Sequence, residues 1–412
     1  MRLRERYPVP AAVVLVLVAQ FVARLPMGMY SVALVLAVVH WTSSFATAGA
    51  AVAGFNLAGG VIAPLVGRLA DRHDPRPILG GLALGHALAV VLLVATAEGL
   101  PHVVFPVLAA VAGGCMPPIG PALKATWSRR FDSEDRVLRA VFGLESVLGE
   151  AVYLLGPALA GAATALGGEP FSLLTAGALT LGGTAAIIAG STLAHPLAGA
   201  TRSGPSAAAL RSRGLQILLV TQALSFVAFS GISLGVLALA EAQGLSATGA
   251  LLLSVWAAGA AIGALIWGAR AQWPGTQAQQ LHAVLWLVAA TSGAVALAGA
   301  ALPAVAATAG WALLGAALLA AGVALAPGAI VEATLVGQVT AVGRRTESYA
   351  WLGTAALVGS AAGSALFGLL VAQWGGAAAL IGAVVTAAAA AMIAGLGRPA
   401  LELPTAVADR GS

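Results

Sequence analysis

Charged residues are scarce in this 412-residue chain, in which Asp, Glu, Lys and Arg together make up 8%. In soluble globular domains, roughly a quarter of the residues are charged. Hydrophobic residues reach 60%, and the mean hydropathy is +0.96. These values exclude a soluble globule, and the sequence predicts an all-α polytopic membrane protein lying in a lipid bilayer.

Cysteine is nearly absent as well. The one cysteine, Cys115, lies inside an apolar run, so the chain forms no internal disulfide and offers no thiolate cluster to a metal. His86 alone does not make a metal site. The chain also lacks a Gly-Lys phosphate loop, a His-Glu zinc helix and a Ser/His/Asp set. We therefore expect no enzyme, no metal site and no cofactor.

Lysine occurs once, as Lys124, so that arginine carries the net charge of +5. The basic residues stand singly or in small groups between apolar runs, which excludes a nucleic-acid-binding patch and is typical of topology signals. They occupy alternate connections: Arg2, Arg4, Arg6; Arg68, Arg72, Arg76; Arg129, Arg130, Arg136, Arg139; Arg202, Arg211, Arg213; Arg270; Arg344, Arg345; Arg398, Arg410. We expect both termini to be cytoplasmic, in the plasma (inner) membrane of a bacterium.

About twelve apolar runs are long enough for a helix of ~20 residues to cross a bilayer. We expect helices over 11–39, 46–67, 78–97, 102–124, 139–166, 171–194, 214–240, 247–269, 281–300, 304–328, 347–373 and 376–397.

A long polar connector over 196–213 divides the chain into an N-terminal bundle, 1–195, and a C-terminal bundle, 214–398, with a cytoplasmic tail over 399–412. Weak internal repeats support two parallel halves. Gln20 pairs with Gln222, and Lys124 with Glu332, at offsets of about 200 residues.

The charged segment between the second and third runs contains Gly67, Leu69, Asp71, Arg72 and Arg76 in an order that resembles the signature loop of the major facilitator superfamily. Asp74 and Pro75 depart from that pattern. The resemblance implies a twelve-helix fold of two pseudo-symmetric six-helix bundles that works by alternating access. It also implies that Gly67, Asp71, Arg72 and Arg76 form a conformational latch. The alternative is a solvated loop whose arginines only set topology.

The fifth run contains Gly156, Pro157 and Gly161, which resemble the fifth-helix motif of the drug:proton antiporters and efflux permeases in that family. Val152 stands where the motif has a further glycine, and the fourth run lacks their arginine. The resemblance favours export over import, with close, bent packing against the other half. The alternative is an ordinary helix kink.

Ionisable side chains inside the spans are candidates for proton coupling, because burying them costs a few kcal/mol. Arg24 and Glu150 lie at similar depths, so we expect an ion pair in which Glu150 takes and releases the proton. The alternative is a permanent structural pair. Glu145 lies about 140° around the helix from Glu150. It is a second candidate, although we expect it to reach toward Arg139 or a loop arginine.

Lys124 and Glu332 occupy matching places in the two halves and are candidates for a cytoplasmic gate, the alternative being side chains that reach the interface. Other polar or amphipathic residues inside the spans could contact substrate, although each is more often a packing or hydrogen-bonding group. These cavity candidates are Gln20, Tyr30, Asn56, Tyr153, Gln222 and Trp256.

The sequence thus predicts a monomeric secondary transporter that uses the proton gradient to export a small amphipathic or hydrophobic compound. A proton-coupled importer and a sugar exporter share nearly all these features. A different class stays open, namely a transporter-like protein that does not transport and serves as a sensor or assembly partner.

Overall fold

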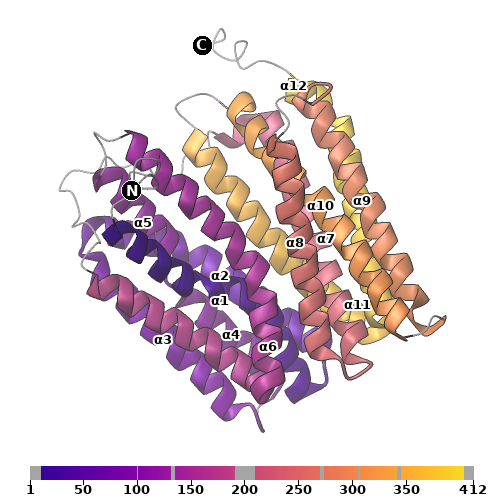
Figure 1. The fold of residues 1–412 in the computed structure, drawn as a ribbon, viewed down its shortest axis with the longest axis horizontal. Helices are drawn as coiled ribbons and strands as arrows, with labels where there is room; N and C mark the ends of the chain where they lie inside the picture. Colours follow the sequence, from indigo (N-terminus) through magenta and orange to yellow (C-terminus); the bar gives the residue numbers. More distant parts are fainter. Residues whose placement is uncertain are drawn as a thin grey trace, which may run out of the picture. The chain divides into compact units, whose positions relative to one another are not determined.

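The computed structural model describes residues 11–99, 101–130, 135–190, 209–269, 273–304, 307–340 and 345–402, and these are almost entirely helical (Figure 1). The chain divides into two compact units, Met1–Thr201 and Arg202–Ser412. The division falls inside the connector expected over 196–213.

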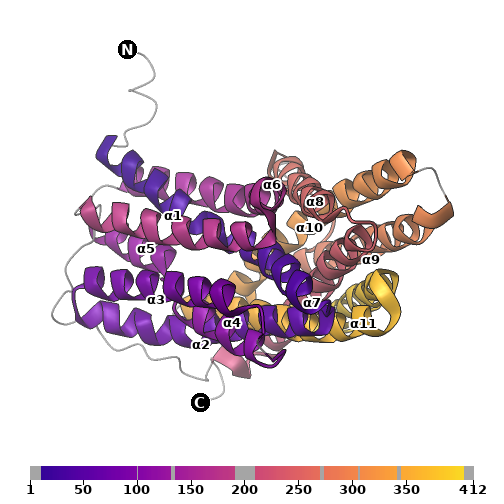
Figure 2. The ribbon, with the colours of Figure 1, turned by 90° about the horizontal axis from the view of Figure 1, so that it is seen from below.

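In the first unit the helices lie alongside one another in both views (Figures 1 and 2). They are α1 (Ala11–Thr42), α2 (Phe45–Arg72), α3 (Pro75–Thr96), α4 (Val104–Gly114), α5 (Ile119–Arg130) and α6 (Asp135–Ala189).

The second unit begins with a short 3₁₀ turn and ends with a five-residue helix. Its elements are η1 (Ala209–Arg211), α7 (Arg213–Glu241), α8 (Ser246–Ala269), α9 (Gln277–Ala301), η2 (Leu302–Ala304), α10 (Ala307–Val339), α11 (Arg345–Leu396) and α12 (Arg398–Glu402).

Two of these helices are each a pair of helices joined at a glycine. In α6, Gly168 has φ of 82°, and the Ser172 hydroxyl donates to the Ala160 carbonyl at 3.1 Å, so the segments on either side of it lie next to each other. In α11, Gly375 has φ of 77°. A positive φ is open to glycine at little steric cost. The expected fifth and sixth, and eleventh and twelfth, helices are therefore present.

Nine helices in the described ranges are long and apolar enough to cross a membrane. Two of them are the joined pairs, and the expected fourth crossing is divided between α4 and α5. The observed helices are therefore consistent with twelve crossings and with a multi-pass membrane protein.

The fourth crossing was expected to be continuous, and this was wrong. The helix stops at Gly114 and restarts at Ile119, with Pro117 and Pro118 in the gap. Proline lacks the N–H that an α-helix needs and clashes with the preceding turn, so two in succession interrupt the backbone ladder.

The charged segment after the second crossing is also more helical than expected, since α2 continues to Arg72 and α3 begins at Pro75. Asp74, a departure from the signature pattern, has a structural purpose. Its side chain accepts a hydrogen bond from the Arg76 backbone N–H at 3.0 Å and caps α3, while Pro75 fills the first helical position.

Each unit has its own apolar core. In the first, side chains from α1, α3, α5 and α6 meet around the fully buried Trp127. In the second, α7, α9, α10, α11 and α12 meet around Leu215, Leu281 and Leu335. The α10 helix runs to Val339, well past the expected end at 328, so Glu332 lies inside the helix rather than beyond it.

Candidate functional site

A cluster of three polar side chains lies between α1 and α6 in the first unit. Gln20 Nε2 donates to Glu145 Oε1 at 3.0 Å. Arg24 Nη1 lies 3.7 Å from the same oxygen. Gln20 and Arg24 are one helical turn apart on α1 and therefore share a face. One carboxylate oxygen is thus held by an amide and a guanidinium from the neighbouring helix.

The cluster is shielded from solvent unevenly. The Glu145 side chain is 2% exposed, whereas that of Arg24 is 21% exposed. A methyl group at Gly120 on α5 would lie 3.6 Å from Arg24 Cζ, and one at Gly149 on α6 would lie 3.8 Å from Nη2. The guanidinium therefore lies over backbone that carries no side chains, and part of its surface stays open.

This arrangement differs from the expected one. The ion pair of Arg24 is with Glu145, where we expected Glu150. Glu150 lies in α6, but its side chain is outside the described parts, as is that of Arg139. The expected proton role of Glu150 therefore stays a prediction. Glu145 contacts Gln20 and Arg24 of α1, and its expected contact with Arg139 or a loop arginine stays a prediction.

A second polar chain in the same unit links three helices. Tyr30 on α1 bonds through its hydroxyl to His86 Nε2 on α3 at 2.6 Å, and His86 Nδ1 donates to the Ala112 carbonyl on α4 at 2.7 Å. A carbonyl only accepts, so a neutral His86 carries its proton on Nδ1. Ala112 lies just before the break in the fourth crossing, where backbone carbonyls lose their helical partners.

The second unit has a buried carboxylate of its own. Glu332 on α10 is 3% exposed, and Thr221 Oγ1 on α7 lies 3.1 Å from its Oε1. The same hydroxyl lies 3.0 Å from the Leu218 carbonyl, so two acceptors compete for one proton. Lys124, its expected gate partner, lies in α5 with its side chain outside the described parts. The gate therefore stays a prediction.

Comparison with known proteins identifies the fold that carries these clusters. The sequence matches the model of the Major Facilitator Superfamily over residues 16–331. The chain belongs to the Major Facilitator Superfamily. Among curated proteins, none matches the sequence.

Solved structures of superfamily transporters resemble the chain over nearly its whole length. The nucleoside transporter NupG has a TM-score of 0.72 at 13% identity, covering 96% of this chain and 100% of its own. A bacterial homologue of the iron transporter ferroportin has a TM-score of 0.72 at 13% identity, with 94% and 98% covered. A bacterial homologue of the human lysosomal transporter Spinster has a TM-score of 0.68 at 14% identity, with 94% and 96% covered. Identities this low show the superfamily fold and leave the cargo open.

In this superfamily chain, the fifth-crossing glycine Gly156 packs against α1 of its own unit. A Cβ on Gly156 would lie 2.4 Å from the Gly28 carbonyl carbon, and one on Gly28 would lie 2.3 Å from the Val152 carbonyl oxygen. The two backbones therefore touch, and only glycine fits. Pro157 and Gly161 follow on the same helix and are buried. Their packing against the other half stays a prediction.

The expected latch residues of the superfamily loop lie on two helices. Gly67, Asp71 and Arg72 lie in the last turns of α2, where their side chains are outside the described parts. Arg76 lies in the first turn of α3 and is half-buried. The latch therefore stays a prediction.

The remaining cavity candidates divide by exposure. Trp256 on α8 is 4% exposed and stacks on Phe229 at 4.6 Å between ring centroids, and its contact with substrate stays a prediction. Asn56 and Gln222 are half-buried, and Tyr153 is 52% exposed. Within the described ranges, no three His, Cys, Asp or Glu side chains converge where they could hold a metal ion.

Proposed function

We propose that this superfamily member is a secondary active transporter that exports a small amphipathic compound in exchange for protons. The observation that carries the proposal is the Gln20–Arg24–Glu145 cluster. A carboxylate, a guanidinium and an amide inside membrane-crossing helices are costly, and such groups mark ion and proton pathways.

The chemistry of the cluster suits proton exchange. When Glu145 is ionised, the attraction of Arg24 and the Gln20 hydrogen bond hold α6 against α1. When Glu145 takes a proton, the ion pair is lost and the contact between the helices weakens. Protonation thereby biases two arrangements of the unit, which is what coupling a proton to alternating access requires.

The substrate class follows from the scarcity of charge. Charged residues make up only 8% of the chain, so a binding surface between its crossings contains few ionic groups. Such surfaces favour apolar or weakly polar compounds over multiply charged ones. Export is supported by the resemblance of Gly156, Pro157 and Gly161 to the efflux motif.

One observation favours a second candidate, proton symport of an organic anion. Arg24 makes one ion pair at 3.7 Å and no hydrogen bond to a described residue. A protonated Glu145 would leave this guanidinium charged and open, so that an anion and a proton would bind together and move in the same direction.

Inverted membrane vesicles containing the full chain, acidified inside and loaded with a pH-sensitive dye, separate these functions. Amphipathic compounds that stabilise the purified protein against heat serve as probes. Exchange predicts that a compound added outside raises the internal pH. Symport predicts that the pH rises only when the compound is loaded inside. No response in either arrangement, despite compound binding, would support a sensor and contradict both.

A further inference from the structure

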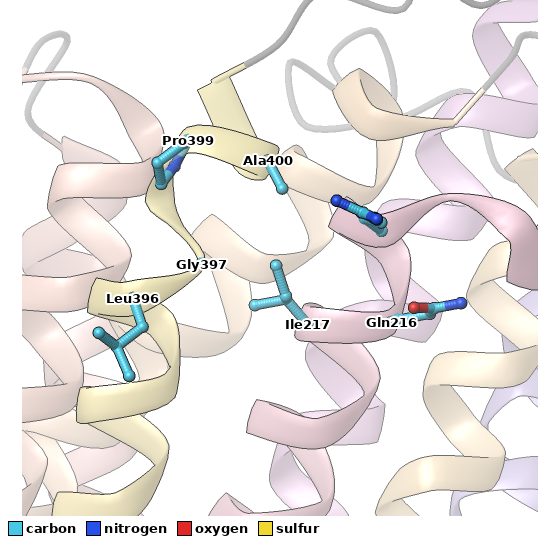
Figure 3. Close-up of a pocket in the computed structure, with 7 residues that line it drawn as sticks. Gln216, Ile217, Leu396, Gly397, Pro399 and Ala400 are labelled. Carbon is cyan, nitrogen blue, oxygen red and sulfur yellow. The ribbon is translucent and has the colours of Figure 1, made fainter.

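A groove opens where the first turn of α7 meets the end of α11 and the start of α12 (Figure 3). Its volume is about 350 Å³. The lining residues are Arg213, Gln216, Ile217, Leu396, Gly397, Pro399 and Ala400. None of them belongs to the proposed proton cluster, so the groove is separate from that site.

The groove lies at the edge of the apolar spans. One crossing begins at Arg213 and another ends at Leu396, and both residues line the groove. A residue at the end of a crossing lies at the depth of the lipid headgroups. The arginine pattern assigns this end to the cytoplasmic leaflet, where anionic lipids are concentrated.

The walls of the groove are fixed by packing and hydrogen bonds. A Cβ on Gly397 would lie 2.6 Å from Ile217 Cδ1, so the missing side chain lets the corner between α11 and α12 approach α7. Leu401 of α12 is 3% exposed in the core of the unit. Thr276 donates to Glu402 Oε1 at 2.9 Å and ties α12 to the start of α9.

The charge around the groove is positive. Glu402, the nearby acid, already accepts from Thr276 and lies 3.8 Å from Arg398 Nη2. Arg213 is exposed and has no acidic partner among the described residues, and the same holds for Arg211 two residues earlier. The groove therefore presents a cation that nothing in the described part of the chain neutralises.

The opposite wall is apolar. Leu396 is 82% exposed, and Ile217 and Ala400 are half-buried. An exposed leucine at the end of a crossing is suited to contact with an acyl chain, and an arginine beside it is suited to a phosphate. The combination matches the two parts of a phospholipid at the depth where those parts lie.

We propose that this groove binds one anionic glycerophospholipid, with its phosphate at Arg213 and an acyl chain along Ile217 and Leu396. Bound lipid bridges α7 and the α11–α12 corner and stabilises the second unit. The proposal is independent of which compound the protein carries and of its direction.

Native mass spectrometry of the full chain in neutral detergent, titrated with phosphatidylglycerol, tests this binding. We expect one retained lipid, with phosphatidylcholine of the same acyl chains retained far less. Arg213→Gln should weaken phosphatidylglycerol binding about fivefold, the effect of about one basic residue at a membrane surface. Ala400→Trp should also reduce binding, because the ring fills the groove while Arg213 stays in place.

Arg211→Gln is the matched control, because Arg211 is exposed nearby but does not line the groove. It should retain most of the binding. Equal losses in the Arg211 and Arg213 variants would show diffuse attraction to the surface and overturn the site. If soluble glycerol phosphate stabilised the protein as much as phosphatidylglycerol does, a lipid occupant would be overturned. Arg213→Gln alters only an exposed side chain, so unchanged phosphatidylglycerol binding in that variant would overturn the role of Arg213.

Discussion

The two units hold their buried carboxylates in different surroundings. Glu145 meets a guanidinium and an amide from α1, whereas Glu332 meets the hydroxyl of Thr221 from α7. Both carboxylates face the first helix of their own unit, but from crossings that do not correspond, because Glu145 lies in the fifth crossing and Glu332 lies in α10, the fourth crossing of its unit. A proton arriving at Glu145 breaks an ion pair, but at Glu332 it only rearranges hydrogen bonds. Under the proposed function, the larger coupling role therefore belongs to the first unit.

The largest expected effect comes from removing the cation. Arg24→Met removes the cation that lies 3.7 Å from the buried Glu145 carboxylate and should lower the free energy of unfolding by on the order of 3 kcal/mol. The Arg24→Met, Glu145→Gln double variant should regain most of that loss, because the carboxylate that lost this cation is replaced by a neutral amide. Thermal unfolding in detergent measures both. If the double variant were no more stable than Arg24→Met, the Arg24–Glu145 ion pair would not distinguish the surroundings of Glu145 from those of Glu332.

The close contact of α1 and α6 gives the next effect. Gly156→Ala should destabilise the protein by about 1–3 kcal/mol, because its methyl group would overlap the Gly28 backbone. The second unit has a similar contact, in which a Cβ on Gly359 of α11 would lie 2.2 Å from the Ala223 carbonyl oxygen of α7. Gly359→Ala should therefore destabilise the protein by a similar amount.

Gly182→Ala is the control for these glycine variants, because a Cβ there meets nothing within 4 Å. It should leave the unfolding temperature unchanged or raise it slightly, since alanine favours helix. Equal losses at Gly156 and Gly182 would show that helix propensity, not contact between the backbones, explains the effect.

The hydrogen bonds that join Tyr30, His86 and Ala112 in the first unit predict a smaller loss of stability. Tyr30→Phe removes the hydroxyl that satisfies His86 in a buried site and should cost about 1–2 kcal/mol. Tyr349→Phe in the second unit removes a hydroxyl that donates to the Ala333 carbonyl from a side chain that is 44% exposed, so the hydroxyl is not enclosed by other protein groups. We expect a change within about 0.5 kcal/mol there. A larger loss in Tyr349→Phe than in Tyr30→Phe would contradict the assignment of Tyr30 to a buried site and Tyr349 to an exposed one.

Among the changes expected to destabilise the protein, the smallest effect is at a helix cap. Asp74→Ala should destabilise α3 by about 1 kcal/mol, whereas Asp74→Ser should preserve most of the stability. Hydrogen exchange of the Arg76 amide reports the cap directly. Unchanged protection in Asp74→Ala would show that Pro75 alone defines the start of the helix.

Much of the fold could be predicted from the sequence, because long apolar runs and arginine-marked connections determine the crossings. The interruption of the fourth crossing was missed although Pro117 and Pro118 were visible, since an apolar run by itself looks continuous. The end of α2 was placed too early because charged residues after Gly67 resemble a loop.

The partners of Glu145 could not be predicted in the same way. Helical periodicity relates Glu145 to Glu150 on one helix, but it does not say which residue of another helix each one meets. That register depends on how close α1 and α6 approach, and Gly28 and Gly156 determine the approach. The role of His86 depends likewise on the break in the fourth crossing, which frees the Ala112 carbonyl.

Proton-driven transport by the Glu145→Gln variant tests the central claim most directly, with Glu332→Gln measured beside it in the same vesicles. We expect the rate of transport driven by a pH gradient to fall at least about tenfold in Glu145→Gln. It should keep exchange of labelled for unlabelled compound, which needs no net proton movement. Glu332→Gln should retain most of its gradient-driven transport. Full gradient-driven transport in Glu145→Gln would contradict the account.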